Sequence, residues 1–245
     1  MRRFLISVFV GAILAPALVL AAGNTANDSF ARAKKMLSQV YEDHRVTLYC
    51  GAQYDAQGNV TLPEGIVIPI KRANRVEWEH VVPAENFGRA FDEWREGSPE
   101  CVDNRGKAFK GRKCAEKVNP EYRHMQADMY NLYPAIGAVN AMRSNFNFQM
   151  LPGEESSFGR CEMKIVDRKA EPPARARGQI ARSYLYMQDA YPQYRMSRQQ
   201  EQLMGAWDKM YPVDQWECTR AKRIEAVQGN ANKFVKEPCE AAGMW

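Results

Sequence analysis

The sequence predicts an α+β protein: a mostly helical single domain around a small antiparallel β region. Between Arg45 and Val82, β-branched and aromatic residues come in short runs separated by turn residues, which is typical of short strands. Before this region and over most of the chain beyond it, apolar residues recur every three or four positions, which indicates amphipathic helices. No internal repeat or low-complexity linker divides the chain after residue 22.

A helix is expected before the β region. Asp28 or Ser29 can accept a hydrogen bond from its first turn, as a helix cap does. Its apolar face consists of Phe30, Ala33, Leu37 and Val40. We expect this helix to pack on the core and assign no function to it. His44, just beyond the helix, is expected to be structural.

Within the β region, residues 55–59 indicate a turn, and residues 66–68 and 76–82 are the clearest apolar strands. Pro83 ends the last of these strands. A helix then begins, and its apolar face consists of Phe87, Phe91 and Trp94.

Two helices are expected after a basic loop. Asn119 caps the first, and its buried face consists of Tyr122, Met125, Met129 and Leu132. Pro134 interrupts this helix and starts the second, whose inward residues are Ile136, Val139 and Met142. This arrangement places Asn131 near one helix end and Asn140 inside the next.

Beyond residue 160 the chain is expected to be mostly helical. Residues 161–166 predict one more strand, and the helical part begins after the two prolines at 172–173. Ser197 and Asp214 resemble the first residues of capping boxes that open two further helices. The last helix is expected to end near Gly229.

The first 22 residues have the three parts of a secretory signal peptide. Residues 1–3 are Met-Arg-Arg, residues 4–20 carry no charge, and residues 21–23 are Ala-Ala-Gly. A membrane anchor is the alternative, because this stretch is just long enough to span a bilayer. The small residues at its end favour cleavage, so we expect residues 23–245 to form a periplasmic or secreted protein without membrane contact.

The six cysteines fit disulfides better than zinc. An even number of cysteines in an exported chain is typical of a disulfide framework. The chain has no Cys-x-x-Cys pair and no His-Glu-x-x-His motif, which argues against a zinc site. Proximity along the chain favours the pairs Cys101–Cys114 and Cys218–Cys239.

The net charge says little about function, whereas the distribution of charge along the chain is informative. Arg2 and Arg3 would leave with the signal segment, so the formal charge of +5 becomes +3, which favours polyanions only mildly. Five cations, however, lie in the nine residues from Arg105 to Lys113, together with glycines that let the backbone approach a ligand. This loop is either a phosphate-binding loop or a solvated charged surface.

Glu79 and His80, at the end of an apolar extended run, are the strongest candidates for chemistry. Glu79 can hold a hard cation, and His80 can move a proton near neutral pH. The amide oxygen of Asn140 is also a good ligand for magnesium or calcium, with a solvent-facing asparagine as the alternative. Taken alone, Glu79 and His80 are also consistent with an ordinary ion pair.

Six motifs occur in order along the chain. They are Trp78-Glu-His-Val-Val-Pro83, Gly111-Arg-Lys-Cys114, Asp128-Met-Tyr-Asn131-Leu-Tyr-Pro-Ala-Ile-Gly-Ala-Val-Asn140, Pro172-Pro-Ala-Arg-Ala-Arg-Gly178, Ala206-Trp-Asp-Lys-Met-Tyr-Pro212 and Trp216-Glu-Cys218. Together they resemble the bacterial endonuclease I family of periplasmic or secreted nucleases, which belongs to the ββα-metal or His-Me finger superfamily. The resemblance extends over nearly all of the chain after residue 22, so it is much more specific than an isolated Glu-His pair.

The resemblance implies a role for each of several residues. His80 resembles the general base, Arg112 the arginine that holds the scissile phosphate, and Asn131 a residue that orients the site. Glu79 and Asn140 resemble the two protein ligands of one Mg²⁺ ion, which Mn²⁺ or Ca²⁺ could replace. Further phosphate contacts are expected from Lys110, Lys113 and Arg143. Gln126 stands where some members of the family carry an acid, and the sequence assigns it no role.

Consecutive residues on a strand point to opposite faces. We therefore expect a bend or bulge that turns both Glu79 and His80 toward one phosphate. Two protein oxygens leave most positions of a magnesium ion to water and phosphate oxygens, as magnesium usually prefers.

The sequence thus predicts a monomeric, magnesium-dependent endonuclease that hydrolyses double- and single-stranded DNA, and RNA, to 5′-phosphate products outside the cytoplasm. Contacts to phosphates carry no sequence information, so cleavage is expected to be nonspecific. The alternative is a non-catalytic, disulfide-stapled module that binds DNA. A different secreted hydrolase is disfavoured, because the chain has no Gly-x-Ser-x-Gly, P-loop or zinc-protease motif.

Overall fold

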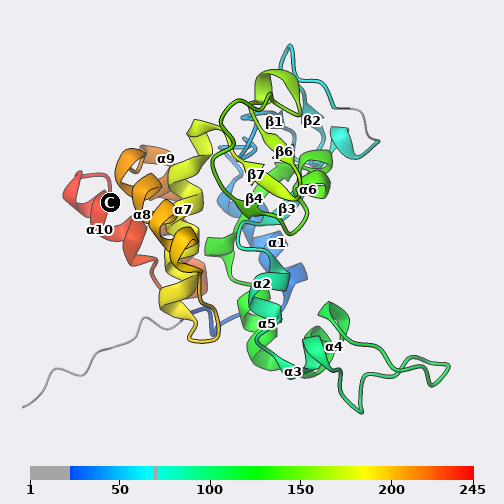
Figure 1. Ribbon diagram of the computed structural model, residues 1–245. Coiled ribbons are helices and arrows are strands. Elements are labelled where there is room, and N and C mark those ends of the chain that lie inside the picture. The colour runs from blue at the N-terminus through cyan, green and yellow to red at the C-terminus, as the bar shows by residue number, and fades with distance from the viewer. Residues whose placement is uncertain (1–22, 69–70) are drawn as a thin grey trace, which may run out of the picture.

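The computed structural model describes residues 23–68 and 71–245, and Figure 1 shows its helices and three small sheets. This architecture confirms the α+β class. The expected signal segment lies outside the described residues. In the part of the chain that is described, no helix has the length and apolar character needed to cross a membrane.

The N-terminal helix forms as predicted. α1 (Phe30–Val40) begins after Ser29, whose side chain accepts a hydrogen bond from the backbone N–H of Arg32. Its buried residues are Ala33, Leu37 and Val40. The spacing of the apolar positions therefore gives the face of this helix that packs on the core.

The β region contains fewer strands than predicted. β1 (Gln53–Tyr54) and β2 (Val60–Thr61) form an antiparallel hairpin around the predicted turn. The expected strand at residues 66–68 does not form. Gly65 precedes it with a φ of +78°, so the chain turns there and residues 66–68 find no neighbouring strand.

Two strands and a helix form the centre of the molecule. β3 (Val76–His80) pairs antiparallel with β4 (Leu132–Ile136), and α6 (Gly137–Arg143) follows β4 directly. The η1 turn (Lys71–Asn74) leads into β3 and contacts α6. In Figure 1, β3 and β4 lie to the right of α7 and below β1 and β2.

The prediction that Pro134 starts a helix is wrong. Pro134 lies in the middle of β4, and the helix that carries Asn140 begins three residues later. All five residues of β4 are buried, and a short continuous apolar run has no periodicity that separates a strand from a helix. A two-stranded sheet has only edge strands, where proline is tolerated.

The predicted helix after Pro83 is divided into α2 (Ala84–Gly88) and α3 (Asp92–Arg95). The division lets the Trp94 ring pack onto Gly88, where an added Cβ would lie only 2.3 Å from a ring carbon. The spacing of the aromatic residues did not reveal this turn. α4 (Arg112–Val118) follows the basic loop.

Asn119 caps the next helix as predicted. α5 (Pro120–Gln126) has proline in its first turn, and the Asn119 side chain accepts a hydrogen bond from the backbone N–H of Tyr122. The 3-10 turn η2 (Met129–Asn131) then leads into β4. The predicted helix therefore ends well before Leu132.

A third sheet follows α6. Its order is β5–β7–β6, with β5 (Asn147–Phe148) parallel and β6 (Lys164–Val166) antiparallel to β7 (Lys169–Glu171). The 3-10 turn η3 (Gly159–Cys161) precedes β6. Only the second half of the strand predicted at residues 161–166 therefore forms.

Four helices form the C-terminal part: α7 (Ala174–Ala190), α8 (Arg198–Met210), α9 (Gln215–Gln228) and α10 (Lys233–Ala241). Ser197 and Asp214 cap α8 and α9 as predicted. Gly229 ends α9 in the left-handed conformation. The sequence did not predict α10, which is short and contains Pro238.

All six cysteines form disulfides. Cys101–Cys114 closes the basic loop and Cys218–Cys239 joins α9 to α10, which confirms both predicted pairs. The third is Cys50–Cys161. Within the described ranges no cysteine is free, so none is available to bind zinc.

Candidate active site

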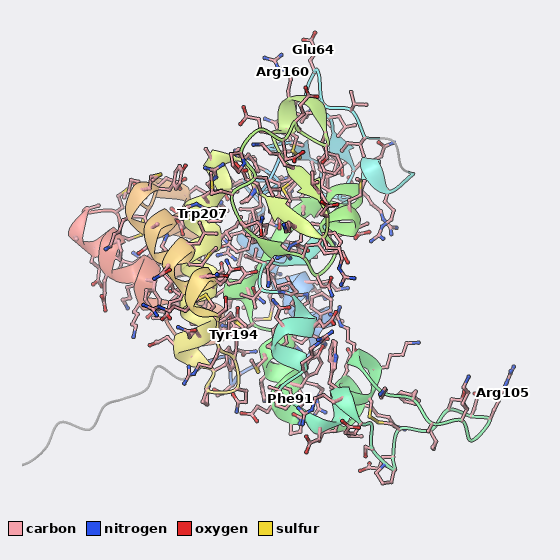
Figure 2. All side chains as sticks on the ribbon, viewed as in Figure 1. Glu64, Phe91, Arg105, Arg160, Tyr194 and Trp207 are labelled. Atoms are coloured by element: carbon pink, nitrogen blue, oxygen red, sulfur yellow. A yellow bond between two sulfur atoms is a disulfide. The ribbon has the colours of Figure 1, made fainter. Side chains whose placement is uncertain are left out.

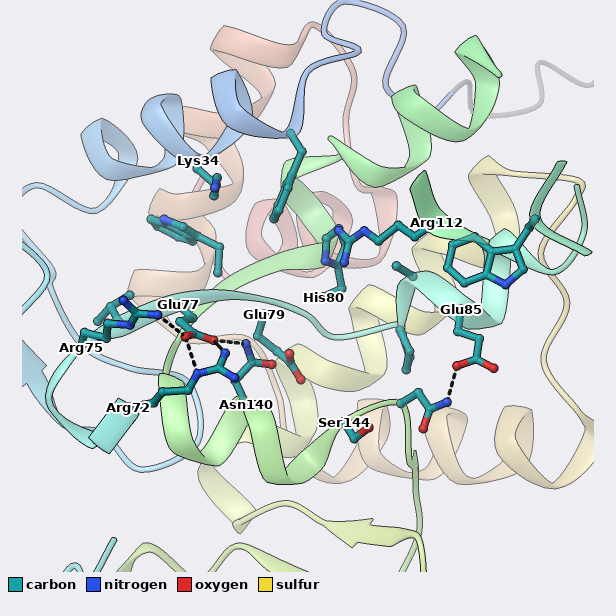
Figure 3. A pocket seen from close by; sticks show the side chains of 17 residues that line it. Lys34, Arg72, Arg75, Glu77, Glu79, His80, Glu85, Arg112, Asn140 and Ser144 are labelled. Atoms are coloured by element: carbon teal, nitrogen blue, oxygen red, sulfur yellow. Dashed lines mark hydrogen bonds and ion pairs between the residues drawn. The ribbon is translucent and has the colours of Figure 1, made fainter. Parts of the chain in front are cut away.

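A pocket of about 690 Å³ beside β3 brings four of the predicted residues together. β3 supplies Glu79 and His80, α4 supplies Arg112, and α6 supplies Asn140. Figure 3 shows these four side chains around the same space. Three separate parts of the chain therefore converge on one cavity.

No bulge brings Glu79 and His80 into this pocket. β3 and β4 pair residue by residue, with Glu79 opposite Tyr133 and His80 opposite Leu132, so the expected bulge is wrong. Glu79 points toward α6, whereas His80 contacts α1 and α5. Within residues 23–68 and 71–245, β4 is the only strand that pairs with β3, so the pocket lies along the open edge of β3 and receives side chains from both faces.

His80 is held as a neutral imidazole. Its Nε2 lies 2.9 Å from the backbone carbonyl oxygen of Gln126. A carbonyl can only accept a hydrogen bond, so the ring carries its proton on Nε2 and has a lone pair on Nδ1. Burial, followed by the positive charge of Arg112, lowers the pKa of His80 to about 3. The imidazole is therefore neutral at pH 7 and can accept a proton.

Glu79 has one oxygen engaged by the protein and one free. Oε1 accepts hydrogen bonds from Arg143 Nη1 at 2.7 Å and from the Tyr49 hydroxyl at 2.8 Å. Oε2 has no hydrogen-bond partner among the described residues. Burial raises the pKa of Glu79, and the adjacent Arg143 guanidinium opposes this rise.

Asn140 is oriented by a residue that the sequence did not suggest. Its Nδ2 donates to Glu77 Oε2 at 3.0 Å, and its Oδ1 has no hydrogen-bond partner among the described residues. Glu77 also accepts hydrogen bonds from Arg72 and Arg75, and these outweigh burial and lower its pKa. Strand alternation from Glu79 could have indicated Glu77, because residues two apart lie on the same face.

The free oxygens fit a hard cation. Glu79 Oε2 and Asn140 Oδ1 are the ligand types that magnesium and calcium prefer. No cluster of three or more histidine, cysteine, aspartate or glutamate side chains occurs in the described part of the chain. A site with few protein oxygens is more typical of magnesium, which keeps several water ligands, than of an all-protein calcium cage.

Comparison with known proteins identifies the family. Residues 25–239 match the family model described as Endonuclease I. The chain belongs to the endonuclease I family.

Three relatives illustrate how far the similarity extends. An extracellular deoxyribonuclease of Aeromonas hydrophila is 41% identical over 221 residues, which cover 86% of this chain and 91% of that protein. A periplasmic deoxyribonuclease of the same species is 39% identical and covers 86% and 87% of the two chains. Endonuclease-1 of Buchnera aphidicola subsp. Acyrthosiphon pisum is 36% identical over 220 residues, which cover 86% and 82%.

In this member of the endonuclease I family, Gln126 connects His80 to Arg112. Its carbonyl oxygen accepts from His80, and its side-chain Oε1 accepts from Arg112 Nε at 2.9 Å. Phe30 contacts both His80 and Arg112. The ring centroids of Phe30 and His80 are 4.9 Å apart, and the guanidinium carbon of Arg112 lies 5.4 Å from the Phe30 centroid. Helical periodicity assigned Phe30 to the core, so sequence reasoning missed its place beside His80. Lys34, one turn along α1, also lines the pocket.

Asn131 does not line the pocket. It is fully buried, and its side chain accepts from the Val82 N–H at 2.7 Å and donates to the Val82 carbonyl at 2.9 Å. These two bonds fix the backbone two residues after His80.

The prediction that Arg143 contacts phosphate is wrong. Its side chain has no exposed area. Besides Glu79, it donates to the carbonyl oxygens of His80 and Val81 at the end of β3. Arg143 therefore holds Glu79 and the backbone of His80 in place from behind the pocket.

Most of the basic loop lies away from the pocket. Figure 2 shows Arg105 at the outer end of a loop that projects from the molecule. Lys110 and Lys113 are exposed but do not line the pocket. Of the five cations, Arg112 is the one whose side chain lines it.

Proposed function

We propose that the protein is a magnesium-dependent endonuclease that hydrolyses phosphodiester bonds of DNA and RNA outside the cytoplasm without sequence preference. One observation carries the proposal: a neutral histidine with a free Nδ1 lines the same pocket as an arginine and two unpaired side-chain oxygens. The names of the relatives, extracellular or periplasmic deoxyribonuclease and endonuclease-1, support the activity and the export.

In the proposed reaction, His80 Nδ1 accepts a proton from the water molecule that attacks phosphorus. The P–O3′ bond breaks, which leaves a 5′-phosphate and a 3′-hydroxyl end. Such general base catalysis typically contributes about 10²–10⁴-fold to a rate. The carbonyl of Gln126 holds Nε2–H, so the ring keeps the orientation and tautomer that this step needs.

Glu79 Oε2 and Asn140 Oδ1 would hold the magnesium ion, which supplies charge stabilisation for the phosphate and the departing oxygen. Arg112 stabilises the same negative charge from the other side of the pocket, and Gln126 orients its guanidinium. The pair of strands β3 and β4 with α6 corresponds to the proposed ββα-metal finger, since β3 carries the base and α6 carries Asn140.

Nonspecific cleavage follows from these contacts, because they address phosphates rather than base edges. The same contacts address the phosphate rather than the sugar, which supports RNA as well as DNA as a substrate. We propose that the enzyme acts as a monomer.

A plasmid-nicking assay tests the proposal against the alternative of a DNA-binding module that does not cut. The wild-type protein should nick plasmid with Mg²⁺, lose this activity in EDTA, and regain it when Mg²⁺ is restored. His80→Ala should reduce nicking by at least about 100-fold and retain salt-sensitive DNA binding. Nicking by the wild type in excess EDTA would contradict the metal site, and full activity of His80→Ala would contradict the base.

A further inference from the structure

A second polar groove, of about 380 Å³, adjoins the pocket beside β3, which we call the reaction pocket. Glu85 and Asn145 line both cavities, and Figure 3 shows Glu85 at the rim of the reaction pocket. We call the second cavity the flanking groove. Its other lining residues include Asn86, Arg89, Phe146, Asn147, Arg168 and Lys169.

The flanking groove carries an excess of positive charge. Arg89 forms an ion pair with Glu85, and Asn145 donates a hydrogen bond to the same carboxylate, so the acid between the two cavities is neutralised. Arg168 and Lys169 are exposed and have no acidic partner in the described ranges. Arg168 and Lys169 are therefore available to bind a polyanion, and the nearby Glu85 does not cancel their charge.

The turn that holds Arg168 is built at a conformational cost. Asp167 and Arg168 connect β6 to β7 with φ values of +48° and +61°. A two-residue hairpin turn of this kind favours asparagine and glycine, because other side chains are strained at positive φ. The chain instead places an arginine there, with its guanidinium carbon 6.0 Å from the centroid of Phe146 in the groove wall.

We propose that the flanking groove binds the sugar-phosphate backbone of the substrate next to the scissile phosphate. Arg168 and Lys169 contact a flanking phosphate, and Asn147, whose Nδ2 has no partner among the described residues, donates to the same strand. The inference rests on the proposed nuclease function and names a substrate contact beyond the reacting group. A substrate that fills both cavities should bind more tightly than one that fills only the first.

The first experiment compares Arg168→Ala/Lys169→Ala with Lys209→Ala/Lys222→Ala. The control removes two exposed cations from α8 and α9, outside the two cavities. Binding of a fluorescein-labelled 20-nucleotide DNA strand is measured by anisotropy in EDTA at several salt concentrations. The groove variant should bind about tenfold more weakly than the wild type, and its salt slope should be smaller by about 1.4, since each phosphate contact to a single strand contributes about 0.7. Equal effects of the groove and control variants would overturn the proposal.

The second experiment separates binding from turn structure. Arg168→Gly removes the side chain and the strain together, so Tm should rise by about 2–4 °C while DNA affinity falls. Arg168→Lys should retain most of the affinity. A rise in Tm with unchanged affinity would assign Arg168 a structural role alone and overturn the proposal.

A small substrate distinguishes the proposed role of the flanking groove from the proposed nuclease function. Bis(p-nitrophenyl) phosphate is too short to reach the flanking groove, so Arg168→Ala/Lys169→Ala should hydrolyse it at the wild-type rate. An equal loss on this substrate and on long DNA would place the effect in the reaction pocket. If the wild type hydrolyses neither substrate, the nuclease function fails, and the anisotropy measurements still decide whether the groove binds DNA.

Discussion

At the scale of single residues, the site depends on which atoms remain free. Oε1 of Glu79 and Nδ2 of Asn140 are bound by the protein, and each side chain keeps its other atom available. His80 uses Nε2 and keeps Nδ1. The surrounding residues thus determine the direction in which each functional group can act.

The depressed pKa of His80 gives a prediction about stability. The ordinary pKa is 6.5, and burial with the nearby Arg112 lowers it to about 3 in the folded protein. Between these values the unfolded chain binds a proton that the folded protein does not, so stability falls as pH falls through this window. His80 should contribute a loss approaching about 1.4 kcal/mol per pH unit.

The measurement is the free energy of unfolding in urea between pH 7 and 4. In His80→Gln, which has no titrating ring, this contribution should be absent and the pH dependence shallower. The wild type and the variant should have parallel pH profiles above pH 7.5. Parallel profiles over the whole range would show that the ring is not held neutral by burial.

Glu77 is expected to act as a positioning residue for Asn140. In Glu77→Gln the amide can either accept from or donate to Asn140, so the asparagine loses its fixed orientation. The Mg²⁺ concentration for half-maximal cleavage should rise by about tenfold or more, as for other residues that orient metal ligands. High Mg²⁺ should restore most of the rate.

Glu93→Gln is a matched control for this effect. Glu93 accepts a hydrogen bond from the Nδ2 of Asn119, so it forms the same type of pair away from the reaction pocket. This variant should have the Mg²⁺ dependence of the wild type. A loss in Glu77→Gln that Mg²⁺ cannot reverse would argue against the positioning role.

At the scale of elements, local patterns predicted four helices that are capped by side chains and missed the strand β4, which depends on packing. Ser29, Asn119, Ser197 and Asp214 all cap helices as expected, because a cap is a local hydrogen bond. β4 is fixed instead by its pairing with β3, more than 50 residues earlier in the chain. No local pattern contains that information.

The Cys101–Cys114 disulfide is expected to position Arg112. Cys114 lies in the first turn of α4, two residues after Arg112, and is fully buried. Replacing both cysteines by alanine should cost about 3 kcal/mol of stability and free the start of the helix. DNA cleavage should then fall even at temperatures where the variant remains folded.

The Cys218–Cys239 pair provides the comparison. It closes a loop of similar length, 21 residues compared with 13, but joins α9 to α10 away from the pocket. Its removal should cost a similar stability and leave cleavage by the folded protein unchanged. Cleavage and urea unfolding are measured for both double variants. Equal cleavage by the two folded variants would refute a special role for Cys101–Cys114.

At the scale of the whole molecule, the candidate site was predictable in part. The motifs indicated His80, Glu79, Asn140 and Arg112, and these four residues line one pocket. The roles of the residues that hold these four side chains in place were not predictable. Phe30, Gln126 and Arg143 reach the site from α1, α5 and α6, whereas the sequence assigned Phe30 to the core, gave Gln126 no role and placed Arg143 at a phosphate.

Asp128 illustrates how distant segments are held together. Its carboxylate is fully buried and accepts hydrogen bonds from the hydroxyls of Tyr186 at 2.7 Å and Tyr191 at 2.6 Å. It also accepts from the backbone N–H of Asn24 and from the side chain of Gln228. The segment before α1, the end of α7 and the end of α9 therefore meet at one acid.

Asp128→Ala should therefore destabilise the whole protein rather than the site. The substitution leaves several buried donors unsatisfied, and each such group costs about 1–3 kcal/mol, so the loss should reach about 3 kcal/mol or more. Urea unfolding measures this loss, and Asp92→Ala, whose side chain is 80% exposed, should change stability by less than about 0.5 kcal/mol. Because Asp128 does not line the reaction pocket, the folded variant should cleave DNA at the wild-type rate at low temperature. A variant as stable as the wild type would show that the three segments are held by apolar packing alone.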